Sequence, residues 1–153
     1  MKKLELKVLP VIIVLIVASI MSGFNLIWPY EISLSNGMSI IAGAISLLAM
    51  AIGAFGVVEF RKAQTTLHPS RLENTSTLVT RRIFALSRNP MYLSFLLFLI
   101  SWAIFLENPL LTVGPMAFVL YMNKFQIIPE ERAMEKIFGD EYKAYCKSVR
   151  RWV

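Results

Sequence analysis

Two long runs without a charged residue constrain the fold of this chain more than any other feature. They cover residues 8–28 and 32–58, which gives 21 and 27 consecutive uncharged positions. A helix rises about 1.5 Å per residue, so roughly 20 apolar residues cross a hydrocarbon layer about 30 Å thick. Both runs therefore predict membrane-spanning helices, over residues 8–28 and 36–58. The first run is also longer than the roughly 7–15 apolar residues of a signal peptide, which favours a retained helix.

Two shorter apolar runs follow, over residues 91–106 and 109–122, and either one alone also fits a buried helix of a soluble protein. Glu107 and Asn108 form a short polar turn between them. Asn108 before Pro109 is the pattern of an N-cap followed by proline at the first helical position. We therefore interpret the two runs as a hairpin of spanning helices.

The predicted hairpin consists of helices over residues 90–106 and 109–128. Gly114-Pro115 should kink the second helix, because proline cannot donate a backbone hydrogen bond. Lys124 lies near its end, where a lysine either extends to the interface or faces an internal polar cavity.

The basic residues orient these helices. All sixteen lie before the first helix, between the second and third, or at or beyond the end of the fourth, whereas the other two connections carry only Glu31 and Glu107. This distribution obeys the positive-inside rule and places both termini in the cytoplasm. It also accounts for the net charge of +6, and no basic and aromatic interleaving of a nucleic-acid-binding module is present.

The predicted fold is therefore all-α and integral to the membrane. We expect a single membrane domain, residues 1–153, with four transmembrane helices and cytoplasmic amphipathic C-terminal helices. The polar segments that could carry chemistry are residues 59–89 and 129–153, which this topology brings to one face.

The first candidate site lies where the third helix begins. Asn89 can cap that helix and Pro90 can start it, which leaves free N–H groups that favour an anion. Arg88 adds a positive charge beside them, and Tyr92 lies one turn inside. An ordinary capped membrane helix with an interfacial arginine and tyrosine explains the same residues.

The second candidate site starts at Pro129, which can open a helix that Gly139 can close. Glu130 and Glu131 fall in the first turn, where the helix dipole stabilises carboxylates and where one of them could hold a cationic group. The tail then places Tyr142, Tyr145 and Val149 on one face. With one histidine, His68, expected to be a loop residue, and one cysteine, Cys146, no metal-ligand set is expected.

At these stretches the sequence resembles the superfamily of isoprenylcysteine carboxyl methyltransferases and phospholipid methyltransferases. Each matching motif is weak by itself, but their order and spacing over residues 65–153 are intact. Asn at position 89 is the usual variant of bacterial members. The motifs are L-V-T (78–80), S-R-N-P-M-Y-L (87–93), P-E-E (129–131), F-G-D-E-Y-K-A-Y (138–145) and V-R-R-W (149–152).

The resemblance implies a membrane-embedded methyltransferase that uses S-adenosylmethionine. Its partners would be the lipid bilayer and a lipid-attached or small-molecule acceptor that offers a carboxylate, thiol or amine, and its location a bacterial inner membrane. The cofactor carboxylate would suit Arg88, and the adenine would suit a slot beside the tail tyrosines. The implied cofactor-binding residues are Arg88, Asn89, Pro90, Tyr92, Glu130, Glu131, Tyr142, Tyr145 and Arg150.

Residues 81–86 depart from the family pattern, which usually has a glycine-containing turn there. This chain has Arg81, Arg82 and Ala85 in that segment. The departure motivates an alternative, a non-catalytic membrane scaffold or partner-binding protein that retains the fold. The alternative predicts that Arg82 or bundle side chains fill the space beside Arg88 and Glu131.

Overall fold

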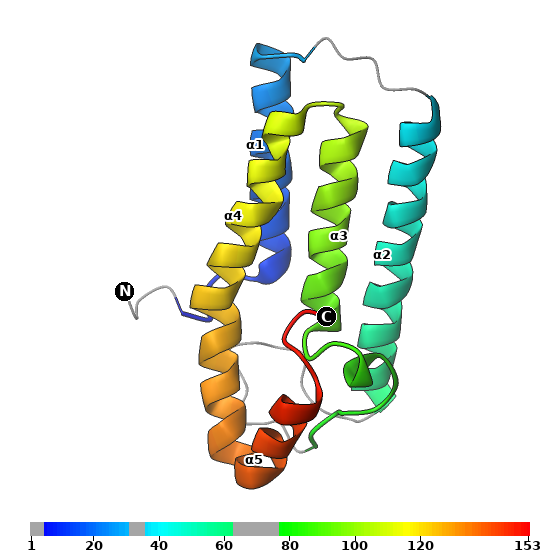
Figure 1. Cartoon of the computed structure of the whole chain (residues 1–153). Coiled ribbons are helices and arrows are strands. Elements are labelled where there is room, and N and C mark those ends of the chain that lie inside the picture. Colours follow the sequence, from blue (N-terminus) through cyan, green and yellow to red (C-terminus); the bar gives the residue numbers. More distant parts are fainter. Residues whose placement is uncertain (1–4, 31–35, 63–76) are drawn as a thin grey trace.

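The α-helices before residue 123 are antiparallel and alternate in direction along the sequence (Figure 1). The computed structural model describes residues 5–30, 36–62 and 77–153, and within these ranges it contains no β-strand, in agreement with the all-α prediction. His68, Glu31 and the part of the resemblance at residues 65–76 lie outside the described residues. The main helices are α1 (Pro10–Ile27), α2 (Asn36–Lys62), α3 (Pro90–Phe105), α4 (Val113–Met122) and α5 (Ile128–Ser148).

Two of these helices are long and apolar enough to cross a membrane. They are α1 and the Gly37–Lys62 part of α2, each with a mean hydropathy of 2.3, and α3 is a shorter apolar helix. Only 22% and 17% of the two apolar windows are buried inside the protein. Ile20 and Leu47, for example, each remain 65% exposed. The core helix of a soluble protein would bury most of such a surface, so these helices present their apolar sides outward.

Small residues bring α2 close to α3. A Cβ added to Gly53 would lie 3.0 Å from Ser94 Oγ, and one added to Gly56 would lie 2.9 Å from the Met91 side chain. Helices in lipid associate by this kind of close backbone approach, since burial of apolar surface gives little there. The contact fixes the beginning of α3, where the candidate site residues lie.

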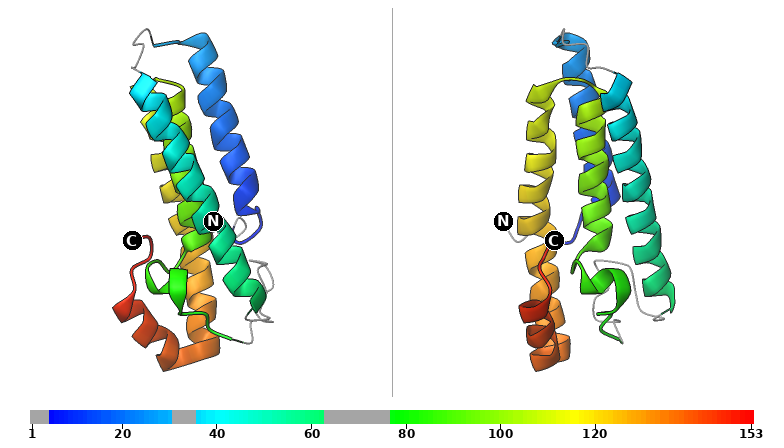
Figure 2. Two further views of the ribbon diagram at one scale, coloured as in Figure 1. Left: turned by 90° about the vertical axis from the view of Figure 1, so that its right-hand side faces the viewer. Right: turned by 45° about the vertical axis from the view of Figure 1, so that its right-hand side comes forward.

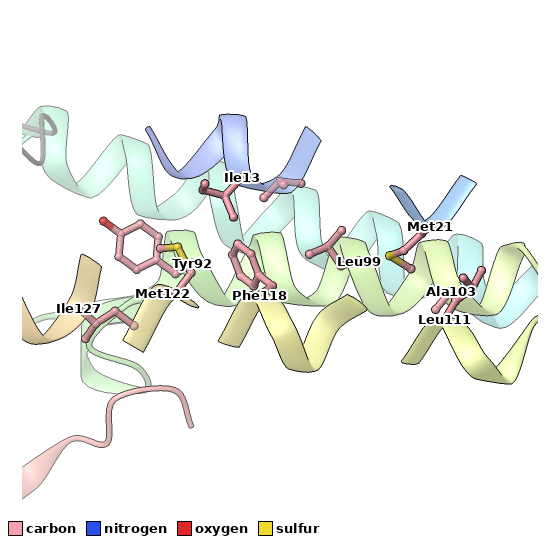
Figure 3. Packing of buried hydrophobic residues seen from close by; sticks show 10 residues of the cluster. Ile13, Met21, Tyr92, Leu99, Ala103, Leu111, Phe118, Met122 and Ile127 are labelled. Carbon is pink, nitrogen blue, oxygen red and sulfur yellow. The ribbon is translucent and has the colours of Figure 1, made fainter. Parts of the chain in front are cut away.

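The core lies between α1, α3 and α4 (Figure 3). Leu99, Phe118, Met122 and Ile127 are completely buried. Tyr92 belongs to the same cluster, at the end nearest the start of α3. The apolar core therefore continues directly into the polar residues of the site.

The turn between α3 and α4 confirms the predicted N-cap. Asn108 Oδ1 accepts from the Leu110 N–H at 3.1 Å and starts a 3₁₀ turn, Pro109–Thr112. Its amide donates to Asn25 Oδ1 and to the Trp28 carbonyl, at 3.0 and 3.1 Å. Pro115, which was expected to kink this helix, lies in the first turn of α4, directly after the 3₁₀ turn, where a proline removes no helical hydrogen bond.

Helix α5 begins at Ile128, one residue before the predicted start at Pro129, but no break separates it from α4. The chain continues without a break from α4 through a π turn, Asn123–Ile127, into α5. Proline lacks an N–H for the carbonyl four residues earlier and crowds it, and the π turn accommodates both effects. Lys124 is exposed, with its ammonium 5.5 Å from the Phe125 ring centre, so it faces outward rather than into a cavity.

Gly139 divides α5 into two halves that fold back on each other. Its φ of 53° and ψ of −122° are not helical, in agreement with its predicted place at a helix end. Figure 2 shows that this bend lies at the end of the molecule opposite the α3–α4 connection. The apolar face of the second half packs inside the protein, in a cluster that contains Leu78, Met134, Phe138, Tyr142, Tyr145, Cys146 and Val149.

Candidate functional site

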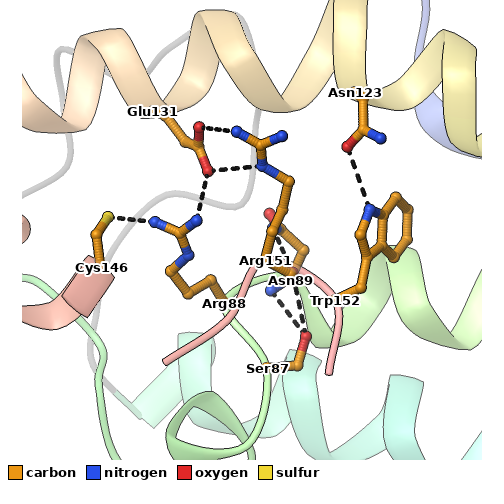
Figure 4. A network of polar contacts seen from close by, with 8 residues as sticks. All are labelled: Ser87, Arg88, Asn89, Asn123, Glu131, Cys146, Arg151 and Trp152. Carbon is orange, nitrogen blue, oxygen red and sulfur yellow. Dashed lines mark hydrogen bonds and ion pairs between the residues drawn. The ribbon is translucent and has the colours of Figure 1, made fainter. Parts of the chain in front are cut away.

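The candidate site forms where three distant segments meet (Figure 4). They are residues 87–89 before α3, the first turn of α5, and an extended tail over residues 149–152. The helical hairpin of α3 and α4 returns the chain to the end from which α3 starts, and the bend at Gly139 directs the tail back toward α3 (Figure 1). The topology therefore assembles the motifs that the sequence separates.

Glu131 is the centre of the polar network. Its Oε1 lies 3.0 Å from Arg88 Nη2, and it accepts two further hydrogen bonds from Arg151, at 3.0 and 2.7 Å. The Glu131 and Arg88 side chains are only 20% and 13% exposed, and that of Arg151 is 34% exposed. The hydrogen bonds from Arg151 to Glu131 raise the pKa of Arg151. We call Arg88, Glu131 and Arg151 the ion triad.

The tail is held by backbone and side-chain hydrogen bonds. The Arg88 N–H donates to the Arg150 carbonyl at 3.0 Å, and Asn89 Nδ2 donates to the Arg151 carbonyl at 2.9 Å. Trp152 Nε1 donates to Asn123 Oδ1 at 3.1 Å. Asn89 thus occupies the predicted N-cap position of α3, but its side chain holds the tail and caps nothing. The Arg150 side chain, predicted to bind the cofactor, is exposed, and Arg151 is the arginine that faces the site.

A second polar cluster lies beside the ion triad, between α3 and the π turn. Tyr92 Oη donates to Glu130 Oε1 at 2.6 Å, and Gln126 Nε2 donates to the same oxygen at 2.7 Å. Burial raises the pKa of Glu130 from 4.5 to about 7, and the two hydrogen bonds oppose part of that rise. Glu130 is therefore a carboxyl group that changes its protonation near neutral pH.

Replacing Glu130 with glutamine should remove a pH dependence of stability. Because the folded-state pKa is raised, the wild-type free energy of unfolding should decrease as pH rises from about 4.5 to about 7 and then level off. The decrease is on the order of 3 kcal/mol, at about 1.4 kcal/mol per pKa unit. Thermal unfolding in detergent micelles across pH 4–8 measures it. Glu135→Gln, at an exposed position on the same helix, should keep the wild-type slope, and an unchanged slope in Glu130→Gln would refute the assignment.

Tyr142 and Tyr145 lie in the second half of α5, whereas Tyr92 lies in α3. The rings of Tyr142 and Tyr145 lie 6.3 Å apart, centre to centre, and Tyr145 Oη donates to the Phe84 carbonyl at 2.6 Å. Burial raises the pKa of both hydroxyl groups. Cys146 contacts the Arg88 guanidinium. Pro90 is fully buried at the start of α3, where it sets the backbone rather than offering a side chain to a ligand.

The charge balance of the ion triad suits an anionic ligand group. Two guanidinium groups share one carboxylate, so one positive charge is not neutralised within the triad. Arg88 Nε is buried and has no hydrogen-bond partner in the part of the chain that the structure describes, although buried donors are normally paired. The triad also lies at the N-terminus of α3, where the helix dipole favours negative charge. A ligand carboxylate at this point would compensate the unpaired charge.

Several residues of this network were not among the predicted binding residues. Arg151 and Trp152 lie in the V-R-R-W motif, of which the predicted binding residue was the other arginine, Arg150. Ser87 accepts from the Asn89 N–H at 3.1 Å and begins the S-R-N-P-M-Y-L motif, but it was not named as a binding residue. Within residues 5–30, 36–62 and 77–153, no three His, Cys, Asp or Glu side chains gather as a metal site.

Comparison with known proteins gives concordant matches. The sequence profile of the family described as phospholipid methyltransferase matches residues 36–141. Over 106 residues (67% of this chain, 54% of the relative) the chain is 30% identical to a probable protein-S-isoprenylcysteine O-methyltransferase of Oryza sativa subsp. indica. Over 110 residues (70% and 39%) it is 30% identical to the methanethiol S-methyltransferase of Pseudomonas deceptionensis.

The fold also matches a solved structure, that of the eukaryotic intramembrane Ras methyltransferase ICMT (isoprenylcysteine carboxyl methyltransferase). The TM-score is 0.74 at 21% identity, over 92% of this chain and 50% of that one. The chain thus spans about half the length of these relatives, or less.

Proposed function

Because the chain belongs to the phospholipid methyltransferase family, we propose that it transfers the methyl group of S-adenosylmethionine to a lipid-attached or small nucleophile at a membrane. The family predicted from the sequence motifs is thereby confirmed. The observation that carries the proposal is the ion triad. It joins the three motif segments at the start of α3 and retains one positive charge for a ligand.

The residues present fit this cofactor. Arg88, with its unpaired Nε, and the α3 N-terminus suit the carboxylate of its methionine part. Glu130 and Glu131 suit its ammonium group, and a ring face such as that of Tyr142 suits a sulfonium. When bound, the cofactor supplies an electrophilic methyl group. The protein then needs mainly to align the acceptor and exclude water, so a general base is not essential.

An apolar cavity supports an acceptor that enters sideways from the lipid. It has a volume of about 730 Å³ and extends from the α3–α4 turn, at Asn108 and Pro109, along α3 and α4 to Leu96 and Val119. Leu96 is one helical turn beyond Tyr92, and Val119 is one turn before Asn123. An acceptor in the cavity would thus have one end beside the second polar cluster and the Trp152–Asn123 hydrogen bond.

We further propose that four helices cross the membrane, with both termini on the cytoplasmic side of a bacterial inner membrane and residues 1–153 as one domain. The alternating directions of α1 to α4 support this topology, with the 3₁₀ extension before α4 and the π turn after it lengthening the fourth crossing. The turn with Glu107 lies at one end, and the site with its arginines lies at the other (Figure 1).

The scaffold alternative loses its main support at Arg82. This side chain is 70% exposed and lies 3.5 Å from Glu59 at the end of α2. It therefore does not fill the space beside Arg88. Arg151 does lie beside Glu131, but on the extended tail and not in the helical bundle.

Binding of S-adenosylhomocysteine tests the proposed function directly. Isothermal titration of the wild-type protein in detergent or lipid should detect binding, and Arg88→Ala should weaken it at least about tenfold, because it removes a charge-assisted contact. Lys147→Ala, at an exposed position of the same region, should bind like the wild type. Correctly folded wild-type protein that binds no S-adenosylhomocysteine would refute the proposal.

A further inference from the structure

The described N-terminal residues reach across to the junction of α4 and α5. We call residues 5–8 the N-terminal strap. The Leu6 N–H donates to the Phe125 carbonyl at 3.1 Å, and the Glu5 carboxylate lies 3.5 Å from Arg132 Nη2. Val8 packs against the core of the bundle. The strap therefore contacts the π turn and the first turns of α5.

The Phe125 carbonyl is the acceptor that Pro129 leaves without its α-helical donor. In a regular helix the N–H of residue 129 would bond to it, but proline has none. Within the π turn, the Ile128 N–H donates to the Asn123 carbonyl, five residues earlier, whereas in a regular α-helix it would donate to the Lys124 carbonyl, four residues earlier. Leu6 supplies the missing donor from outside the helix.

The π turn determines where the site residues point. A helix advances about 100° per residue, so the one extra residue of a π turn rotates everything after it by that amount relative to α4. With the turn in place, Asn123 contacts Trp152, Gln126 and Glu130 contact Tyr92, and Glu131 contacts Arg88. A regular α-helix would rotate Glu130 and Glu131 away from their partners on α3 and before it.

Leu6 holds its contact in an unfavourable backbone conformation. Its φ is 57°, in the left-handed region, which costs a non-glycine residue roughly 1–2 kcal/mol. Such conformations persist where surrounding contacts over-determine them, and they occur preferentially at functional sites. The Leu6–Phe125 hydrogen bond, the contact of Glu5 with Arg132 and the packing of Val8 against the core offset this cost.

We infer that the N-terminal strap is a positioning element of the candidate site, which acts by donating the Leu6 N–H to the Phe125 carbonyl and so stabilising the π turn. Of the two measurements that test this inference, only the affinity for S-adenosylhomocysteine rests on the proposed function. The strap touches neither the ion triad nor Tyr92, and its effect is transmitted through the helix register.

Leu6→Pro tests the inference, because proline has no N–H and cannot adopt a φ of 57°. Amide hydrogen exchange of the peptide over residues 121–131 should become at least about tenfold faster, and S-adenosylhomocysteine affinity should fall about tenfold. Leu9→Pro is the matched control: Leu9 already has a φ of −62°, the value that proline favours, and both readouts should stay within about twofold of wild type. Equal effects of the two variants would overturn the inference.

Two further variants separate the backbone contact from side-chain packing and general stability. Leu6→Gly keeps the N–H and removes the strain, so exchange over residues 121–131 should be no faster than in the wild type. Pro129→Ala gives Phe125 an α-helical donor, and in that background Leu6→Pro should change affinity by less than about twofold. The role of the Leu6 N–H would be refuted if the effects of Leu6→Pro and Pro129→Ala on affinity were fully additive. It would also be refuted if Leu6→Gly made amide exchange over residues 121–131 faster than in the wild type. The exchange readout decides the inference even if no S-adenosylhomocysteine binds.

Discussion

Replacing Glu131 with glutamine is expected to raise the dissociation constant for S-adenosylhomocysteine at least about 100-fold and to lower the free energy of unfolding by about 3 kcal/mol. Glu131 is the only carboxylate of the ion triad, and its loss leaves two guanidinium groups facing each other. The expected destabilisation lies at the lower end of the range for buried pairs, because Arg151 is about one-third exposed. Titration calorimetry and thermal unfolding in micelles measure the two effects.

Glu135→Gln provides the matched control for this experiment. Glu135 lies one turn further along α5, is 53% exposed and pairs only weakly with Lys143, at 3.8 Å. Its replacement should change the free energy of unfolding by less than about 0.5 kcal/mol and leave affinity unchanged. If Glu131→Gln behaves like Glu135→Gln, the ion triad is not the cofactor site.

Gly139→Ala should be the most damaging substitution outside the polar network. The combination of φ 53° and ψ −122° is essentially restricted to glycine, and a side chain there costs about 2 kcal/mol or more. The bend at Gly139 also directs Tyr142, Tyr145 and Arg151 toward the site. Both the unfolding temperature and S-adenosylhomocysteine affinity should therefore fall, by about tenfold or more for the affinity.

Steric clash does not explain this effect, because a Cβ on Gly139 would meet no heavy atom of the described residues within 4 Å. Gly43 has equally open surroundings but lies inside α2. Gly43→Ala should therefore stabilise the protein by up to about 1 kcal/mol through helix propensity. Opposite signs for the two variants support the backbone argument, and a neutral Gly139→Ala would contradict it.

The fold was largely predictable because strong, local signals determine it. Uncharged runs of sufficient length located the apolar helices, and the side-chain cap of Asn108 located the turn between α3 and α4. Small residues such as Gly53 were not recognised as helix contacts, because glycine in an apolar run carries no information on which neighbour it faces. Their role becomes visible only when α3 is beside them.

The sequence predicted which segments form the candidate site, but not which side chains of those segments contact one another. In an extended tail, successive side chains point to opposite sides, so a shift of one residue decides whether Arg150 or Arg151 faces Glu131. The hydrogen bonds of the tail to Arg88 and Asn89 set that register, and they involve backbone groups that every residue has.

The π turn was not predictable for a related reason. A proline after an apolar run can end a helix, kink it or follow the extra residue of a π turn. Local sequence does not distinguish these three outcomes. Here the donor that makes the inserted residue favourable comes from Leu6, at the other end of the chain. Long-range hydrogen bonds of this kind leave no periodic pattern.

The separation of the cavity from the ion triad has an evolutionary consequence. The cavity walls come from α3, α4 and the turn that connects them, whereas the triad comes from residues before α3, early in α5 and in the tail. A mutation at Met116 or Leu120 can therefore alter the shape of the cavity without disturbing a single hydrogen bond of the triad. Under the proposed function, acceptor preference could diverge rapidly between lineages while cofactor recognition stays under strong purifying selection.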